Sequence, residues 1–335
     1  MHPFEEKTLQ FCRRQRLFPP GSRVIAAVSG GVDSVTMLKV LAVHREALGI
    51  GELAAVYIDH NLRPGETGAE CELVRDLAFR LSVPFSCRSV PVEEHCREKG
   101  VSLEASAREL RYQALRAAVG DGGLIAVAHH GDDQAEELLI RLIRGTGTTG
   151  LAGMLPDNGL GVVRPFLCHD RTTIMAYAAD LGLSFCHDSS NDDSARLRNR
   201  VRHQLLPELE RDFNPAMREA LRRTAAIIAG EDDYLRGQAR AAREECVCQL
   251  ANGETALLLA PFAPLHPAIK RRVIDGLLWS LGCPATTERI ETLRELAASG
   301  RTGARIHLPD GLRVAKKRDL LLFSYPLGRR PHRER

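Results

Sequence analysis

The sequence predicts an α/β fold in which a doubly wound, mostly parallel sheet is followed by a helical domain and a small C-terminal α/β segment. In the first half, short apolar runs of β character alternate with helical patterns, which is typical of a parallel sheet with helices on both faces. After Asp188 the chain turns polar, and residues 201–250 then show helical periodicity with no strand run. Near the end, Pro309, Asp310 and Gly311 form a turn signal between two β-like runs, which predicts a hairpin.

The sheet is predicted from five apolar runs in the first half of the chain. They are residues 23–28, 52–59, 85–90, 124–128 and 162–164. Helices are predicted between them at residues 35–48, 66–81, 103–119 and 132–144. In the third of these helices, Leu103, Ala107 and Leu110 recur at helical spacing. Right-handed crossovers then place the carboxyl ends of the strands at one edge of the sheet.

Length and composition restrict the class of protein. The chain has 335 residues, of which 44% are hydrophobic and 27% charged, so disordered, collagen-like and coiled-coil classes are excluded. We expect a catalytic domain over residues 1–188, a linker and helical domain over 189–255, and a small α/β segment over 256–335. No apolar run approaches the ~20 residues of a membrane span, and the N-terminus has no secretory-signal pattern. The expected location is the cytoplasm, without membrane contact.

Basic residues are distributed unevenly, although the net charge is only +3. Residues 194–206 contain four arginines and His203 but no acidic residue, and further basic clusters occur at 270–272 and 316–318. Such patches can neutralise nucleic-acid phosphates, but each by itself is also typical of a solvated surface. Charge alone therefore leaves a nucleic-acid partner open.

The cysteines do not indicate a metal site. There are nine, they are scattered, and the nearest pair in sequence, Cys246 and Cys248, has no second pair at zinc-ligand spacing. We interpret most of them as reduced packing residues.

The strongest functional motif joins the first predicted strand to the first helix. It is SGGVDS, consisting of Ser29, Gly30, Gly31, Val32, Asp33 and Ser34. Adjacent glycines let the backbone approach an anion, the serines add hydroxyl donors, and a helix N-terminus offers free N–H groups. The motif matches neither the lysine-containing phosphate loop nor the GxGxxG dinucleotide fingerprint. It resembles the PP-loop of the N-type ATP pyrophosphatases, which cleave ATP between its α- and β-phosphates and transfer AMP to a substrate oxygen.

Acids and histidines follow two of the predicted strands. Asp59 and His60 end the second strand, and His129 and His130 end the fourth. Because the carboxyl ends of parallel strands lie at one edge of the sheet, we expect these side chains near the SGGVDS loop. His130 could handle a proton or contact phosphate, or it could be purely structural.

The helix after the fourth strand carries acids in its first turns. They are Asp132, Asp133, Glu136 and Glu137. The apolar stripe of this helix consists of Ala135, Leu138, Leu139, Leu142 and Ile143. Helical geometry then sets Asp133 and Glu137 opposite the stripe and Glu136 on its flank. Such acids suit a magnesium ion on pyrophosphate or a cationic amine substrate, whereas Asp132 could equally complement the helix dipole.

The preceding helix carries two arginines that could meet developing phosphate charge. Arg108 and Arg111 are about one turn apart. The structural alternative is that Arg108 pairs with Glu104, four residues before it.

Together these residues resemble one PP-loop family, the tRNA(Ile)-lysidine synthetases. The similarity covers residues 23–207 through SGGVDS, DHNLR, ARELRY, AHHGDDQAE, RGTGTTGLAGM, RPF, and DSSN followed by RNRVRHQLLP. It implies a Rossmann-like PP-loop fold and a ligase reaction. In that reaction ATP adenylates O2 of the wobble cytidine of an isoleucine tRNA with a CAU anticodon. The side-chain amine of L-lysine then displaces AMP to give lysidine.

The resemblance also implies roles for individual residues. ATP binding falls to Ser29, Gly30, Gly31, Val32, Asp33, Ser34 and Asp59. The catalytic residues are Asp33, Arg108, Arg111 and His130, and the lysine-binding residues are Asp133 and Glu136. The tRNA-binding residues are Arg196, Asn199, Arg200 and Arg202. The resemblance further implies that Mg²⁺ binds together with ATP, with Asp33 as the candidate protein ligand. A homodimer is compatible with the resemblance.

Two departures and several alternatives remain. Glu137 stands where this motif more usually carries threonine, so its charge either joins the lysine pocket or faces solvent. The chain is expected to be a short form, without the additional C-terminal domain of longer family members. The alternative function is a PP-loop tRNA thiolase that adenylates a base for sulfur insertion, but the sequence contains no CxxC for an iron–sulfur cluster. An ammonia-using amidating ligase and a non-enzymatic RNA-binding module are further alternatives.

Overall fold

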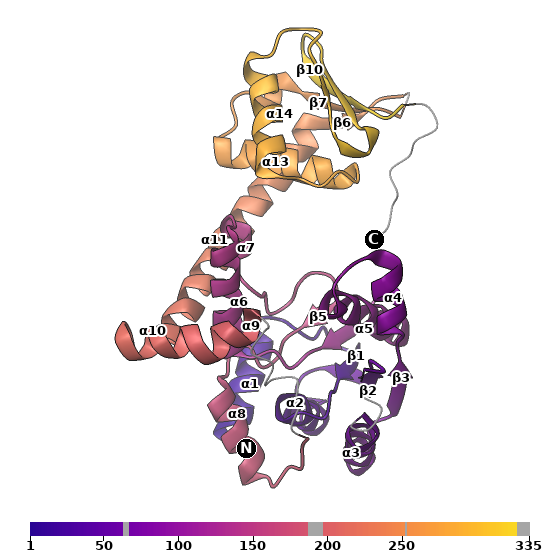
Figure 1. Cartoon of the computed structure of the whole chain (residues 1–335), viewed down its shortest axis with the longest axis vertical. Helices are drawn as coiled ribbons and strands as arrows, with labels where there is room; N and C mark the ends of the chain where they lie inside the picture. Colours follow the sequence, from indigo (N-terminus) through magenta and orange to yellow (C-terminus); the bar gives the residue numbers. More distant parts are fainter. Residues whose placement is uncertain (63–66, 187–196, 252, 327–335) are drawn as a thin grey trace. The chain divides into compact units, whose positions relative to one another are not determined.

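The computed structural model describes residues 1–62, 67–186, 197–251 and 253–326 (Figure 1). The chain divides into two compact units, Met1–Ala229 and Gly230–Arg335, and each has its own sheet and apolar core. The three-part division expected from the sequence stays a prediction. Within the described residues, no helix has both the length and the apolar character needed to cross a lipid bilayer.

The first unit is built on a five-stranded parallel sheet. Its strands are β1 (Ser22–Ala27), β2 (Ile50–Asp59), β3 (Phe85–Ser89), β4 (Leu124–Ala126) and β5 (Val162–Val163). They lie in the order β3-β2-β1-β4-β5, so the strand order reverses between β1 and β4. In an open α/β sheet, ligands bind outside the carboxyl ends of the strands at such a switch point. The predicted doubly wound α/β fold is confirmed.

Helices cover both faces of this sheet (Figure 1). The helices of this part of the chain are α1 (Pro3–Arg14), α2 (Val32–Val43), α3 (Thr67–Arg80), α4 (Val92–Lys99), α5 (Leu103–Val119), α6 (Gly131–Arg144), α7 (Thr148–Leu151) and α8 (Arg171–Asp180), of which α1, α2, α3, α5 and α8 contribute to the cores on the two faces. Successive side chains of β1 serve opposite faces, because Val24 packs into the core that contains α2 whereas Ile25 packs with α5. α1 meets α8 through the stacked rings of Phe4 and Tyr177, whose centroids are 4.4 Å apart.

The last part of the first unit packs against α6. α9 (Leu197–Arg200) runs into a π-helical stretch (Val201–Leu205) and then α10 (Leu206–Asp212). α11 (Met217–Cys246) follows, and the boundary between the two units falls within it. Val201 and Leu206 are buried against Ile140 of α6. This contact brings the basic segment 197–205 to the helix that carries the predicted lysine-binding acids. π-Helical turns are rare in proteins, and those that do occur often lie at functional sites.

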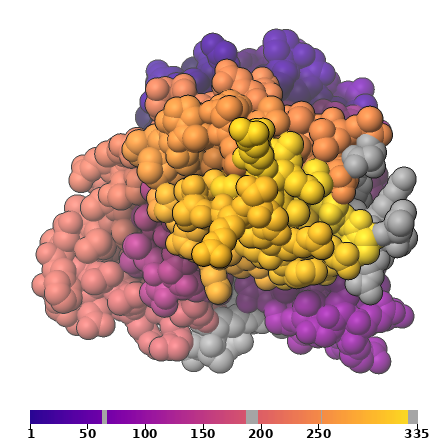
Figure 2. Space-filling model, turned by 90° about the horizontal axis from the view of Figure 1, so that it is seen from above, coloured from indigo at the N-terminus to yellow at the C-terminus, as the bar shows by residue number. Residues whose placement is uncertain are grey.

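The second unit, orange to yellow in Figure 2, combines an antiparallel sheet with helices. Its strands are β6 (Val247–Gln249), β7 (Thr255–Leu258), β8 (Arg305–His307), β9 (Arg313–Lys316) and β10 (Leu320–Ser324), in the order β6-β7-β10-β9-β8. Its helices are α12 (Leu259–Phe262), α13 (Pro267–Ser280) and α14 (Thr287–Ser299). The predicted hairpin is confirmed, with Ile306 opposite Val314. The prediction that residues 201–250 contain no strand was wrong, because β6 lies within them. With three residues, β6 is too short to show a strand pattern in the sequence, and its pairing with β7 defines it.

Candidate active site

The SGGVDS loop closes on itself between β1 and α2. Ser34 Oγ accepts a hydrogen bond from the Ser29 N–H (3.1 Å) and donates one to the Gly31 carbonyl (2.9 Å). Gly30 has a φ of +84°, in the left-handed region that favours glycine, and Gly31 is the N-cap of α2. Because a glycine cap has no side chain, the first N–H groups of α2 are left for water or an anion. The loop therefore has the geometry of a phosphate-binding site.

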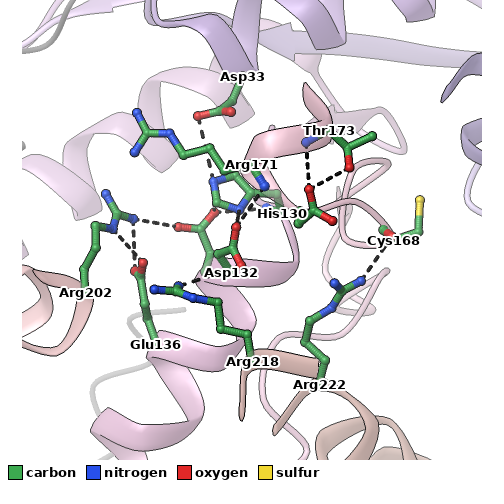
Figure 3. Close-up of polar contacts among 12 residues, drawn as sticks. Asp33, His130, Asp132, Glu136, Cys168, Arg171, Thr173, Arg202, Arg218 and Arg222 are labelled. Atoms are coloured by element: carbon green, nitrogen blue, oxygen red, sulfur yellow. Dashed lines mark hydrogen bonds and ion pairs between the residues drawn. The ribbon is translucent and has the colours of Figure 1, made fainter. Parts of the chain in front are cut away.

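Asp33 and His130 face each other across the switch point (Figure 3). Asp33 lies in the first turn of α2, His130 directly precedes α6, and Asp33 Oδ2 is 3.9 Å from His130 Nε2. Asp33 Oδ1 is buried and has no hydrogen-bond partner among the described residues. Burial raises the pKa of Asp33 above its usual range, although His130 and Arg171 oppose the shift. A buried carboxylate oxygen without a partner is suited to a cation.

Asp59 and His60 end β2 at the carboxyl edge of the sheet, as predicted. Asp59 Oδ1 accepts the N–H of Asn61 (2.8 Å), which shapes the turn after the strand. Burial and the charge of Arg111 lower the pKa of His60, so its ring is neutral near pH 7.

His130 is surrounded by carboxylates. The residue is buried, and beyond Asp33 its Nδ1 lies 3.8 Å from Asp132 Oδ2 and its Nε2 lies 3.5 Å from Asp133 Oδ2. These distances exceed those of direct hydrogen bonds, and Nδ1 has no hydrogen-bond partner in the described part of the chain. The imidazole is therefore held near three carboxylates without a direct hydrogen bond from its ring to any of them, which suits a group that moves a proton.

The predicted lysine-binding acids are buried in α6 and paired with arginines. Glu136 is 1% exposed and Asp133 is 8% exposed. Arg198 Nε and Arg202 Nε lie 3.0 and 2.6 Å from the two oxygens of Glu136. Both arginines also donate to Asp133 Oδ1, and the backbone N–H of His130 donates to Asp133 Oδ2. Although burial favours the neutral carboxyl, His130 and Arg198 hold the pKa of Asp133 well below its usual range, so this pocket binds positive charge.

The orientation predicted for α6 is partly wrong. Leu142 and Ile143 of the expected apolar stripe are 50% and 58% exposed, whereas Asp133 and Glu136 are buried. The reason is that residues 197–206 cover the acidic side of α6 with Val201, Leu206 and two arginines. A helix face that is polar in sequence is thus interior in the fold.

Arg108 and Arg111 lie on α5 on the N-terminal side of Tyr112 in sequence. Their guanidinium carbons are 5.3 and 5.5 Å from the centroid of the Tyr112 ring. Arg111 is half-buried, and burial together with Arg108 lowers its pKa. In the described chain Arg108 forms no ion pair with Glu104, so the structural alternative for this arginine is not observed.

His129 and Arg164 form a pair to which the sequence assigned no role. Burial lowers the pKa of His129 to about 3, against the opposing charge of Asp133, so the ring is neutral. Arg164 Nε donates to His129 Nδ1 (3.3 Å), which leaves the ring proton on Nε2. Arg164 is buried and also donates to the Leu155 carbonyl (2.6 Å). The available signal was the position of the RPF motif directly after a strand.

Asp132 joins α6 to neighbouring helices. Its Oδ2 accepts the N–H of Arg171, the first residue of α8 (2.8 Å), and its Oδ1 lies 3.7 Å from Arg218 Nη1 of α11 (Figure 3). Arg222 lies across Gly131, where an added Cβ would clash with the Arg222 guanidinium group. These contacts fix the N-terminus of α6, where the predicted site begins.

Comparison with known proteins identifies the family. Residues 1–209 match the PP-loop domain, and residues 257–321 match the TilS substrate binding domain. The tRNA(Ile)-lysidine synthase of Geobacillus kaustophilus is 32% identical over 329 residues, which cover 96% of this chain and 70% of that protein. The tRNA(Ile)-lysidine synthase of Thermobifida fusca is 35% identical over 319 residues, which cover 92% and 93%. The chain belongs to the tRNA(Ile)-lysidine synthase family.

Membership of the lysidine synthase family confirms the resemblance and the assignment as an ATP-using ligase that acts on tRNA. A solved U34-tRNA thiolase of Methanococcus maripaludis has a TM-score of 0.56 and 15% identity, and the match covers 68% of this chain and 80% of the thiolase. At that identity the likeness is one of fold alone. It gives the thiolase alternative no support.

Glu137 occupies the position where the lysidine synthase motif more usually carries threonine. Its Oε1 accepts the Arg141 Nε–H (2.7 Å), and Arg141 Nη1 donates to the carbonyls of Gly150 and Gly153 (2.8 and 3.2 Å). The additional negative charge is therefore neutralised by an arginine that holds the glycine-rich loop after α6.

The residues predicted to bind tRNA do not share one environment. Arg196 lies outside the described residues, Asn199 is buried, and Arg200 is exposed. Arg202 points toward Glu136 rather than toward solvent (Figure 3). In this structure only Arg200 of the described members offers an open cation to a phosphate backbone.

Proposed function

We propose that the chain synthesises lysidine in two steps. The O2 atom of the wobble cytidine in an isoleucine tRNA with a CAU anticodon first bonds to the α-phosphorus of ATP, and pyrophosphate leaves. The side-chain amine of lysine then attacks C2, the C2–O2 bond breaks, and AMP leaves. Activation divides one difficult substitution into two easier ones. The observation that carries the proposal is a phosphate-binding loop and a buried carboxylate pair at one edge of the sheet, in a lysidine synthase family member.

ATP is proposed to bind along Ser29 to Ser34. The N-terminal N–H groups of α2 and the two serine hydroxyls would contact its phosphates, with Asp59 at the neighbouring strand end. The unpartnered buried Asp33 Oδ1 fits a hard cation, and we propose that it helps to hold Mg²⁺. Such an ion, when bound, neutralises charge that develops on the leaving pyrophosphate.

Two arginines and a histidine are proposed to assist the transfer. Arg108 and Arg111 would stabilise negative charge around the α-phosphate, because both guanidinium groups lie beside the Tyr112 ring and Arg111 is half-buried, so little reorganisation is needed. The lysine ammonium must lose a proton before it attacks, and His130 is proposed to accept that proton. Its support is its burial between Asp33 and Asp133 without a direct hydrogen bond from its ring to either carboxylate.

The nucleophile is proposed to be free L-lysine, held by Asp133 and Glu136. Two buried carboxylates next to each other require positive charge, and in this structure two guanidinium groups supply it. An ammonium group satisfies the same requirement. The charge of the pocket therefore favours lysine over amino acids with neutral side chains.

Contacts with tRNA are proposed for both units. Support for the second unit is the match of residues 257–321 to a substrate binding domain. In this unit, Arg271 and Arg272 of the basic cluster pair with Glu291 and Asp232. A homodimer and a cytoplasmic location stay predictions, and the molar mass in solution will test the former.

The test is to incubate the purified chain with Mg²⁺-ATP, labelled lysine and an isoleucine tRNA transcript with a CAU anticodon. Lysidine synthesis requires acid-stable label on the tRNA and release of AMP, both lost when the wobble cytidine is changed. AMP release without lysine transfer would contradict the lysine site and turn attention to sulfur or ammonia as the nucleophile. An Asp33→Asn variant should lose both products and serves as the negative control.

A further inference from the structure

We propose that Arg198 and Arg202 form an internal plug in the amine site, which lysine must displace before it can react. The two residues are called the arginine plug. This proposal rests on the proposed role of Asp133 and Glu136 as the lysine-binding acids. It adds a competition between the chain's own guanidinium groups and the substrate.

The first observation is that every oxygen of the two acids is already occupied. Glu136 Oε1 accepts from Arg202 Nε (2.6 Å), and Glu136 Oε2 accepts from Arg198 Nε and Arg202 Nη2 (both 3.0 Å). Asp133 Oδ1 accepts from Arg198 Nη2 (2.9 Å) and Arg202 Nη2 (3.2 Å), and Asp133 Oδ2 accepts the backbone N–H of His130 (3.0 Å). Two guanidinium groups already balance the two carboxylates, so an ammonium group that entered without releasing one of them would be a third positive charge beside two negative charges.

The second observation is that the plug covers the acids. The side chain of Glu136 is 1% exposed and that of Asp133 is 11% exposed, whereas those of Arg202 and Arg198 are 17% and 32% exposed. The guanidinium groups therefore lie between the carboxylates and water. Lysine approaching from solvent meets the arginines before it reaches the acids.

The third observation is that the backbone that carries the plug is anchored by residues other than the two arginines. Val201, which lies between the two arginines in sequence, and Leu206, which follows them, anchor the segment in an apolar contact with Ile140. The long arginine side chains can rotate away while this contact stays in place. Displacement is then a change of side-chain rotamer rather than the movement of a lid.

The exchange of one cation for another explains why a ligand with a positively charged side chain would displace the plug, whereas a neutral ligand would not. Removing a partner from a buried ion pair leaves an uncompensated charge, which is strongly unfavourable. Lysine replaces the positive charge that it removes, whereas a neutral side chain of the same length does not. The cost of opening lowers the apparent affinity for lysine by the fraction of molecules in which the plug is open.

The test measures lysine binding and the state of the plug separately. Calorimetry on the full chain compares the wild type with an Arg198→Gln/Arg202→Gln double variant and with an Arg211→Gln variant. Arg211 is an exposed arginine on α10 that pairs with its neighbour Asp212. We expect the double variant to bind lysine at least about threefold more tightly, because it has no competitor to displace. The Arg211→Gln variant should bind lysine as the wild type does.

A second measurement keeps the proposal testable if the double variant does not fold. Nitrogen-15 NMR of the wild-type arginine side chains should show slowly exchanging Nε–H signals for Arg198 and Arg202, since both donate through Nε to Glu136. Saturating lysine should abolish their protection, and norleucine, which lacks the side-chain ammonium group of lysine, should leave it intact. The Arg211 signal provides the internal control.

The outcomes separate the plug from the lysine site itself. Bound lysine with both Nε–H signals still protected, or a double variant that binds lysine no more tightly than wild type, overturns the plug. If Glu136→Gln weakens lysine binding in the same experiments, the lysine site survives that failure. If Glu136→Gln leaves lysine binding unchanged, the acids are not the lysine site, and the plug falls with them.

Discussion

Glu136 receives the hydrogen-bonding edge of Arg202 with both carboxylate oxygens, Nε to Oε1 at 2.6 Å and Nη2 to Oε2 at 3.0 Å. A planar guanidinium group matches a carboxylate in this way, and the two parallel bonds fix the relative orientation of the side chains. Because Glu136 is almost fully buried, the pair contributes only while both charges are present. The residue proposed to bind substrate is therefore also one that stabilises the local fold.

Replacement of Glu136 separates adenylation from lysine transfer. A Glu136→Gln variant keeps the shape of the side chain but removes the charge that an ammonium group requires. We expect kcat/KM for lysine to fall by roughly a hundredfold, the order of effect seen when a buried charge pair loses one partner. Exchange of labelled pyrophosphate into ATP in the presence of the tRNA, which follows adenylation alone, should change by less than about threefold, because the SGGVDS loop is untouched. Labelled lysine transfer and pyrophosphate exchange measure the two steps.

The control for this variant is Glu72→Gln. Glu72 pairs with Arg75 on the exposed surface of α3, and its side chain is 62% exposed. Neither step should respond to its replacement, since exposed ion pairs contribute little. Equal losses of adenylation and lysine transfer in Glu136→Gln would show that the residue serves the fold or the ATP site rather than the amine.

The left-handed backbone of Gly30 predicts a defect in ATP binding. A Gly30→Ala variant places a Cβ at φ +84°, which costs about 1 kcal/mol or more and distorts the loop that holds Ser29 and Ser34. Gly21, at the other end of β1, has φ +77° and nothing within 4 Å of an added Cβ, so Gly21→Ala carries the same backbone strain away from the site. Both variants should lose similar stability in urea denaturation, but only Gly30→Ala should raise the KM for ATP, by roughly tenfold or more, on the order of one lost phosphate contact. An unchanged KM in Gly30→Ala would exclude the loop as the phosphate site.

Local sequence signals sufficed for the sheet and for the phosphate loop, because both depend on patterns within a few residues. The five apolar runs correspond to β1 through β5, and the two adjacent glycines stand where the loop needs a positive φ and an open helix N-terminus. α1, α4 and α8 were not predicted. They pack as shorter segments whose role is apparent only from contacts with the rest of the unit, such as the stacking of Phe4 on Tyr177.

The sequence of the basic segment 196–202 did not predict which of its arginine side chains face the interior and which face solvent. Arginines alternate with other residues from 196 to 202, a pattern equally typical of a solvated surface. Arg198 and Arg202 turn inward because Val201 and Leu206 pack on α6 and set the acids of that helix beneath them. Such pairing across about 65 positions of sequence is a tertiary property, and it explains why the arginine partners of Asp133 and Glu136 could not be predicted.

Glu137 offers a test of how local the lysine pocket is. A Glu137→Thr variant restores the residue more usual in the family and breaks the contact with Arg141, which should cost about 0.3–0.5 kcal/mol as for other helical i, i+4 pairs. Lysine affinity should stay within about twofold of wild type, because the charge of Glu137 is neutralised by Arg141 and not by the ligand. Calorimetric titration with lysine and urea denaturation provide the two readings. A several-fold change in lysine affinity would place Glu137 inside the pocket.

Buried neutral histidines predict that the first unit loses stability as the pH falls. His169 is fully buried, Thr8 Oγ1 lies 2.8 Å from its Nε2, and burial together with Lys7 lowers its pKa to about 3. An unfolded histidine titrates near pH 6.5, so between about pH 6.5 and pH 3 the unfolded chain binds a proton that the folded chain does not. The stabilisation is therefore complete above that range and decreases on acidification, by up to about 1.4 kcal/mol per pH unit for each such group. Urea denaturation followed by circular dichroism at pH 7.5, 6.5 and 5.5 should show a smaller pH dependence for His169→Gln than for wild type, while His203→Gln, at an exposed position, should match wild type. Equal slopes for His169→Gln and wild type would show that the His169 ring is protonated in the folded chain.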